Sequence, residues 1–73
     1  SDYVIVYLPC PKDWLGKTLQ QVDVRKRFQV SVLAIYRKDD MIMDLRADTR
    51  LEKGDSLLVL GHREDVERVE ALG

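Results

Sequence analysis

The segment from Val30 to Arg37 constrains the fold most, because it reads as a strand that is apolar on both of its faces. Successive side chains of a strand point to opposite faces of a sheet. One face would carry Val30, Val32, Ala34 and Tyr36, and the other Ser31, Leu33, Ile35 and Arg37. A strand of this kind is expected at the centre of a sheet or at an interface.

The short length of the chain favours an interface as the place for this strand. A chain of 73 residues forms one small domain and buries only about 60% of its unfolded surface, so its core is thin. Its one cysteine cannot form an internal disulfide. We therefore expect residues 1–73 to be a single domain taken from a larger protein, and association with a second copy to bury more apolar surface.

Two further strands and a first helix are predicted around the strand at Val30. Residues 3–8 are rich in β-branched and aromatic side chains and precede two prolines, which is typical of a strand. Residues 18–21, Thr-Leu-Gln-Gln, fit a capping box that begins a helix reaching about Phe28, with an interruption near Asp23. Residues 41–43 are expected to pair with the strand at Val30 through a polar turn at 38–40.

The C-terminal third predicts a strand followed by a helix. Residues 45–50 are irregular and polar, and residues 56–60 form the last strand, which Gly61 is expected to end. A helix over 64–72 is predicted from its apolar stripe at three-residue spacing. The expected class is α+β, a small and mostly antiparallel sheet with two helices in the order strand-helix-strand-strand-strand-helix.

Charge and hydropathy exclude several classes of function. The 12 basic and 13 acidic residues are interspersed and give a net charge of −1, whereas nucleic-acid binding favours a basic stripe. No apolar run approaches the roughly 20 residues of a membrane-spanning helix, and no signal-peptide pattern is present. A cytoplasmic domain is expected.

The residues that could form a phosphate, catalytic or metal site give only weak signals. The strand, Gly61 and the following helix could hold a phosphate, but a nucleotide site needs several glycines, and Glu64 and Asp65 would repel an anion. Cys10 and His62 stand alone as possible nucleophile or ligand, and we interpret them as a filler and a loop residue. The carboxylates of residues 39, 40 and 44 are interpreted as a solvated hairpin rather than a cation site. We expect no catalytic residues, no metal and no enzyme activity.

Three stretches taken together resemble the TrkA-C domain, also called the RCK C-terminal domain. They are residues 16–25 (GKTLQQVDVR), 32–37 (VLAIYR) and 48–61 (DTRLEKGDSLLVLG), and the similarity runs over about residues 14–72. The resemblance implies a dimeric regulatory domain of a bacterial or archaeal potassium channel, uptake system or cation/proton antiporter, held at the inner face of the membrane by the rest of the protein or by a partner.

The resemblance also implies a small-ligand site in the dimer cleft, where some members bind cyclic di-AMP. By position the cleft would be lined by Ile35, Arg37, Met43, Asp44 and Leu45, with Arg37 as the contact for phosphate. Cyclic di-AMP binders commonly have Asn-Pro where this chain has Asp44-Leu45. We therefore expect weak binding of that ligand, or none, and no other cofactor.

Three hypotheses for function remain open at this point. The domain could sense a ligand for a cation transport system. It could be a structural dimerisation module without a ligand, or the sensor of a transcription regulator whose DNA-binding part lies elsewhere. The sequence that precedes this segment would discriminate among them.

Overall fold

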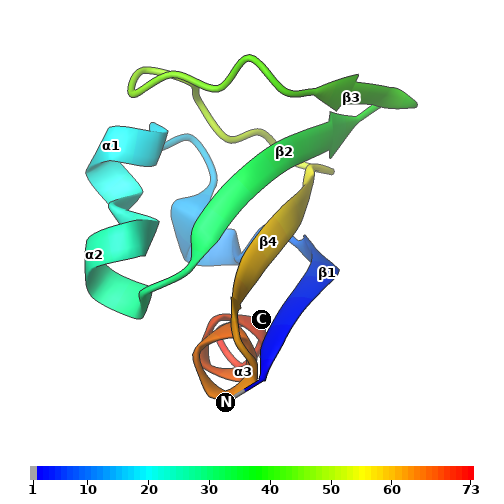
Figure 1. Cartoon of the computed structure of the whole chain (residues 1–73). Helices are drawn as coiled ribbons and strands as arrows, with labels where there is room; N and C mark the ends of the chain where they lie inside the picture. The colour runs from blue at the N-terminus through cyan, green and yellow to red at the C-terminus, as the bar shows by residue number, and fades with distance from the viewer. Residues whose placement is uncertain (1) are drawn as a thin grey trace.

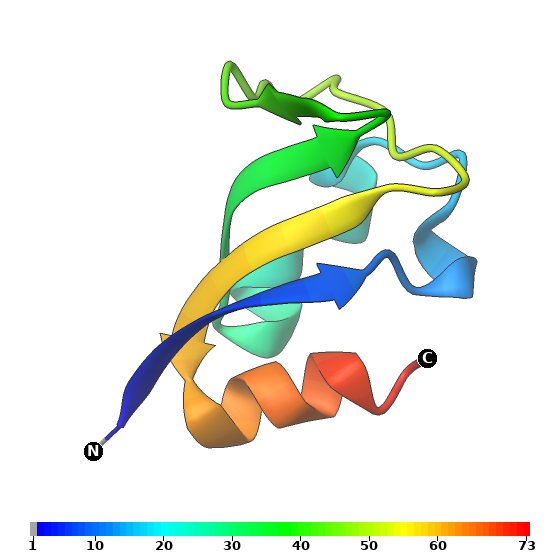
Figure 2. The ribbon, with the colours of Figure 1, turned by 90° about the vertical axis from the view of Figure 1, so that its right-hand side faces the viewer.

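The computed structural model describes residues 2–73 and shows a four-stranded antiparallel sheet with its helices on one face (Figures 1 and 2). The strands are β1 (Tyr3–Pro9), β2 (Ser31–Arg37), β3 (Asp40–Ile42) and β4 (Ser56–His62), in the spatial order β1-β4-β2-β3. The helices are η1 (Lys12–Trp14), α1 (Leu19–Val22), α2 (Val24–Phe28) and α3 (Arg63–Glu70). The predicted class and order of elements are confirmed.

The hydrophobic core lies between the sheet and the helices. Figure 2 shows α3 lying along β1 and β4, and α1 with α2 covering the other half of the same face. The core cluster consists of Leu8, Trp14, Val22, Val24, Val30, Ile35, Leu51, Leu57, Val59, Val66 and Val69. Because this one layer contains the whole buried cluster, the opposite face of the sheet is left without a covering element among residues 2–73.

A bulge in β2 decides which of its side chains enter the core. Val32 pairs with Val59, and Ile35 pairs with Leu57. Between these two pairs β2 therefore contains one residue more than β4. One extra residue reverses the alternation of faces beyond the bulge. Ile35 therefore lies in the core with no exposed surface. The simple alternation expected from the sequence, which puts Ile35 on the same face as Ser31, therefore does not hold beyond the bulge.

The break in the first helix occurs at the predicted place. Thr18 accepts from the amide of Gln21, and the Gln21 side chain accepts from the amide of Thr18, so the capping box is present. Asp23 adopts a left-handed conformation with φ 54° and ψ 52° and separates α1 from α2. Its side chain makes no capping hydrogen bond to α2, so the break comes from backbone conformation.

The β2–β3 hairpin is closed by a two-residue turn. Arg37 pairs with Asp40, and both intervening residues have positive φ, 47° at Lys38 and 66° at Asp39. Turns of this shape match the twist of the two strands they join. The predicted polar turn is confirmed, and β3 begins at Asp40, one residue earlier than expected.

Gly61 has a role other than the predicted one. It does not end β4, which continues to His62, and it pairs with Val4 of β1. A Cβ atom at position 61 would lie 2.8 Å from Cγ1 of Val30, which is buried. The residue before β2 therefore packs directly on the Gly61 backbone, and the absence of a side chain at 61 is a packing requirement.

We predict that Gly61→Ala lowers the free energy of unfolding by about 1–3 kcal/mol, because the new methyl group overlaps a well-packed valine. Val30→Ala removes Cγ1, the atom nearest to the new methyl group, so Gly61→Ala should cost less in that background than in the parent. Urea denaturation of the parent, both single variants and the double variant measures the coupling. Strictly additive costs would contradict the proposed overlap.

Candidate functional site

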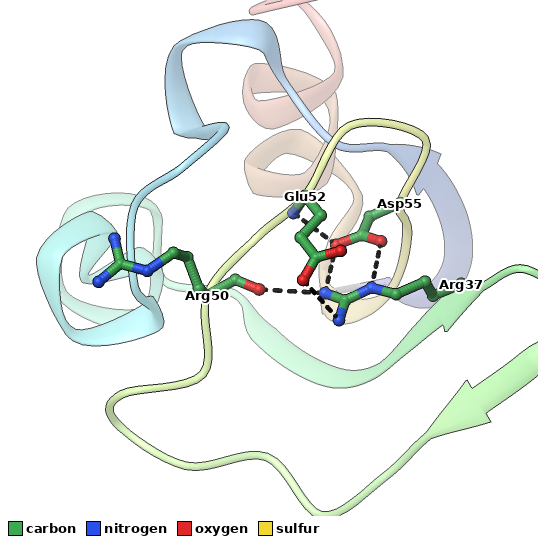
Figure 3. Close-up of polar contacts among 4 residues, drawn as sticks. All are labelled: Arg37, Arg50, Glu52 and Asp55. Atoms are coloured by element: carbon green, nitrogen blue, oxygen red, sulfur yellow. Dashed lines mark hydrogen bonds and ion pairs between the residues drawn. The ribbon is translucent and has the colours of Figure 1, made fainter.

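The most extensive polar cluster of the described chain gathers around Arg37, the last residue of β2 (Figure 3). Its Nε donates to Oδ1 of Asp55 at 2.8 Å, and its Nη2 donates to Oδ2 of Asp55 at 2.9 Å. Nη2 also donates to the carbonyl oxygen of Arg50 at 3.0 Å. Nη1 lies 3.1 Å from Oε2 of Glu52. A guanidinium and a carboxylate in this two-bond arrangement form one of the stronger contacts available to a protein.

Asp55 is the buried centre of the cluster. Its side chain has no exposed surface, and Oδ2 also accepts from the Glu52 amide at 2.8 Å. Burial by itself raises the pKa of the Asp55 carboxyl, but the hydrogen bonds and charge of Arg37, with the Glu52 amide, outweigh it and hold that pKa below its usual value. The same hydrogen bonds to Asp55 raise the pKa of Arg37. The pair is therefore ionised at neutral pH.

The turn at residues 53–55 positions Asp55. Gly54 has φ 90°, which a residue with a Cβ rarely adopts, and it brings the Asp55 amide within 3.1 Å of the Glu52 carbonyl. The Asp55 carbonyl then accepts from the Cys10 amide at 2.9 Å, just beyond β1. The turn at residues 53–55 thus connects the ends of β1, β2 and β4.

The loop before this turn is held against the start of the first helix. The Leu19 amide donates to the Thr49 carbonyl, and the Leu51 amide donates to the Lys17 carbonyl, each at 2.9 Å. The Arg50 side chain donates to the Gly16 carbonyl. Because Arg37 binds the Arg50 carbonyl, the arginine is connected through this loop to the N-terminus of α1.

The five predicted ligand residues differ in how exposed they are. Arg37 is half-buried, and Met43 and Asp44 are exposed in the segment that follows β3. Leu45 is half-buried and packs against the core. Ile35 is enclosed in the core, where its strand partner is Ile42. Four of the five are thus available at or near the surface, and Ile35 lies behind them; their role as ligand contacts stays a prediction.

The second notable feature is the sheet face opposite the helices, which we call the open sheet face. It is formed by Tyr3, Ile5, Tyr7, Ser31, Ala34, Tyr36, Met41, Ser56, Leu58, Leu60 and His62. None of these is Asp, Glu, Lys or Arg, and Tyr3, Ile5 and Tyr7 are 66%, 60% and 55% exposed. Tyr7, Tyr36 and Ser56 line a groove of about 420 Å³, with the two rings edge to face at 6.4 Å.

Sequence reasoning missed both partners of Arg37 and most of the open sheet face. In the sequence Asp55 is only a charged residue directly before the last predicted strand, and Glu52 is a charge three residues earlier. The alternation of Tyr3, Ile5 and Tyr7 within residues 3–8 was the available signal for the face. It was ambiguous because Val4, Val6 and Leu8 on the other side are apolar too.

The weaker candidates have ordinary surroundings. Burial, with the nearby Asp55 carboxylate, raises the pKa of the Cys10 thiol to about 11, so the thiol is protonated at neutral pH. His62 stacks on Tyr3 with ring centroids 4.1 Å apart. Within residues 2–73 no three His, Cys, Asp or Glu side chains come together as a metal site, and no helix is long and apolar enough to cross a membrane.

Comparison with known proteins defines the class. The TrkA-C domain family matches residues 3–72, and the chain belongs to this family. The RCK C domain of the potassium transport protein KtrA, solved in complex with cyclic di-AMP, superposes with a TM-score of 0.88 and is 28% identical. That match covers 96% of this chain and 82% of the other. The GsuK channel, at 24% identity and a TM-score of 0.83, shares the fold.

Curated relatives are proteins of membrane transport. An uncharacterized transporter of Synechocystis is 36% identical over 71 residues, which is 96% of this chain and 12% of that protein. The K(+)/H(+) antiporter subunit KhtT of Bacillus subtilis is 29% identical over 94% of this chain and 44% of its own length. The Ktr system potassium uptake protein A of the same organism is 26% identical over the whole chain and 33% of its own length. The chain thus spans less than half of each of these relatives.

We predict that the stability of the protein falls in acid because of Asp55. A carboxyl whose folded-state pKa is lowered contributes stability above its unfolded pKa, and this contribution is lost as the pH falls through the folded value. The loss should begin near the ordinary pKa of 3.8 and continue below it. Denaturation midpoints measured from neutral pH into this range should fall less in Asp55→Asn than in the parent.

The exposed Asp13→Asn provides the matched control for this experiment, because Asp13 forms no ion pair with residues 2–73. It should retain the acid dependence of the parent. At neutral pH Asp55→Asn should cost about 3 kcal/mol, because it leaves Arg37 without its buried partner. An Asp55→Asn variant as stable as the parent at neutral pH would contradict the importance of the pair.

Proposed function

We propose that this chain is a dimeric, ligand-sensing regulatory domain of a bacterial or archaeal cation transport system, most simply one for potassium. Membership of the TrkA-C family carries the proposal. Its support is that relatives of this segment are subunits of a potassium uptake system, a K(+)/H(+) antiporter and an ammonium/H(+) antiporter. The domain would act at the cytoplasmic side of the membrane through the remainder of its protein or through a partner subunit.

A regulatory role rather than a catalytic one fits the chemistry of the cluster. Its charged groups are an arginine and two carboxylates bound to one another, and the thiol nearby is protonated at neutral pH. None of these is an activated nucleophile. A domain of this kind regulates by binding a ligand more tightly in one arrangement of its two copies than in another.

The open sheet face is the surface we assign to the second copy. A sheet is normally covered on its apolar faces, and large exposed apolar patches mark interaction sites. Tyr7 and Tyr36 are large aromatic side chains of the kind enriched in interface centres. Because the face carries no residue of permanent charge, it is self-complementary without any need for charge pairing. A solved structure with this fold, at 16% identity, is an RCK_C domain dimer of BusR.

The ligand cleft of this proposal lies at the edge of that face, where β2 and β3 pair. Arg37, Met43, Asp44 and Leu45 would line it, with Ile35 behind them. Cyclic di-AMP is the ligand of the KtrA RCK C domain. For this chain we expect that ligand to bind weakly. The exposed Asp44, which Arg46 approaches to 3.5 Å, adds a carboxylate beside the proposed cleft, and the guanidinium of Arg37 is already engaged by Asp55.

The alternative of a dimerisation module without a ligand is favoured by one observation. Arg37 contacts four oxygen atoms of its own chain, which is typical of an arginine that stabilises the fold. The two functions differ in their consequences, because a purely structural module would dimerise equally well with and without any small molecule. The dimer and the ligand are therefore tested separately.

We predict that the chain sediments as a dimer at micromolar concentration and that Ile5→Lys makes it monomeric without unfolding it. Ile5 is 60% exposed at the open sheet face, so the folded monomer tolerates lysine, whereas a buried unpaired charge in the dimer costs about 3 kcal/mol or more. Sedimentation equilibrium and circular dichroism measure the two properties.

Leu72→Lys is the matched control, because Leu72 is 45% exposed but lies after α3 and outside the open sheet face. This variant should remain dimeric. A parent that is monomeric at hundreds of micromolar, or an Ile5→Lys variant that still dimerises as the parent does, would refute the assignment.

We predict that cyclic di-AMP binds the double variant Asp44→Asn, Leu45→Pro more tightly than the parent. Removing a like charge and fixing φ near −65° should each contribute about 1 kcal/mol. No hydrogen bond from the Leu45 amide to residues 2–73 would be lost on replacement by proline. Titration calorimetry on both proteins measures the change, and each single variant should give part of the gain.

Submicromolar binding by the parent would contradict the expected effect of Asp44 and Leu45. No heat of binding in either protein would instead support the ligand-free module or a different ligand. Each of these outcomes is independent of the sedimentation result, so the dimer assignment would stand or fall separately.

A further inference from the structure

The guanidinium group of Arg37 has an inner edge and an outer nitrogen with different partners (Figure 3). The inner edge, Nε and Nη2, is held by Asp55 and by the Arg50 carbonyl at 2.8–3.0 Å. The outer nitrogen, Nη1, faces Oε2 of Glu52 at 3.1 Å. Glu52 therefore occupies the one nitrogen of Arg37 that the buried side of the cluster does not engage.

The two carboxylates differ in how firmly they hold the arginine. The Asp55 side chain has no exposed surface, whereas the Glu52 side chain is 57% exposed. A buried pair is costly to break, but an ion pair with an exposed partner contributes only about 0–1 kcal/mol. An anion arriving from solvent can therefore compete with Glu52 for Nη1, and it cannot compete with Asp55.

The charge of the cluster opposes such an anion as long as Glu52 is present. One guanidinium and two carboxylates sum to −1, so the arginine presents no net positive charge to a phosphate. Removing the Glu52 charge would make the cluster neutral and would free Nη1, whose two N–H groups suit a phosphate oxygen. The backbone of residue 52, which donates to Asp55, would remain in place.

We infer that Glu52 is a specificity-determining residue, which occupies the outer nitrogen of Arg37 and sets how strongly phosphate-bearing ligands bind this domain. The inference rests on the proposed function, because it concerns the same cleft. It adds that affinity for an anion is controlled by displacement of an intramolecular carboxylate. A substitution at this one exposed position is then sufficient to change the affinity of the cleft for phosphate-bearing ligands.

The test uses inorganic pyrophosphate as the probe and the NMR signals of the Arg37 side chain as the readout. Glu52→Gln keeps the size of the side chain and removes its charge. The apparent Kd for the change in the Arg37 Nε–Hε signal should fall by about two- to fivefold relative to the parent, as expected for loss of a weak competing ion pair. Unfolding midpoints should differ little, since Glu52 is exposed.

Glu67→Gln is the matched control, because it makes the same change of charge on α3, which Figure 1 shows at the opposite end of the molecule from the end of β2. Its apparent Kd should equal that of the parent. Equal affinities in the parent and Glu52→Gln, or an Arg37 signal that pyrophosphate leaves unchanged in both, would overturn the inference.

A second titration with cyclic di-AMP separates this inference from the proposed function. If pyrophosphate binding tightens in Glu52→Gln while neither protein binds the cyclic dinucleotide, Glu52 has its assigned role and cyclic di-AMP is not the ligand. If Glu67→Gln tightens pyrophosphate binding as much as Glu52→Gln does, the effect comes from net charge alone, and the role of Glu52 is refuted.

Discussion

The pairing of Arg37 with Asp55 is the interaction on which the arrangement of the chain most depends. The Asp55 carboxylate is wholly buried, and a buried carboxylate requires a partner of opposite charge and several hydrogen bonds. Arg37 supplies the charge from the end of β2, and the Glu52 amide supplies a further donor. Through the Asp55 carbonyl and the Arg50 carbonyl, the same cluster reaches the segment after β1 and the loop bound to α1. Loss of the pair would therefore loosen several elements together.

The bulge in β2 has a comparable influence on the two faces of the sheet. It directs Ile35 into the core and leaves the exposed Tyr36 on the open sheet face, with the buried Ala34 beneath its neighbours on that side. Without the extra residue, Tyr36 would point toward the helices and Arg37 away from Asp55. The bulge thus determines both which residues form the proposed dimer surface and whether the arginine can reach its buried partner.

These two features connect the fold to the proposed function. The proposed dimer surface and the Arg37 cluster both involve the C-terminal half of β2, so a single short strand contributes to both. Glu52 and Asp44 are exposed carboxylates near the place where a ligand would enter. Under the proposed function, the affinity of the cleft for anions would depend on these two surface side chains, neither of which belongs to the core.

The sequence by itself determined the class and order of the elements, the capping box at Thr18, the break at Asp23 and the hairpin turn. These are local features, since propensity, capping and turn geometry act over a few neighbouring residues. The resemblance of three stretches also identified the family. Only the tertiary structure decided that Ile35 is in the core, that Gly61 accommodates Val30, and that Arg37 is bound to Asp55 and Glu52. Each of these depends on register or on contacts between residues far apart in the chain, and a one-residue bulge is enough to reverse what alternation predicts.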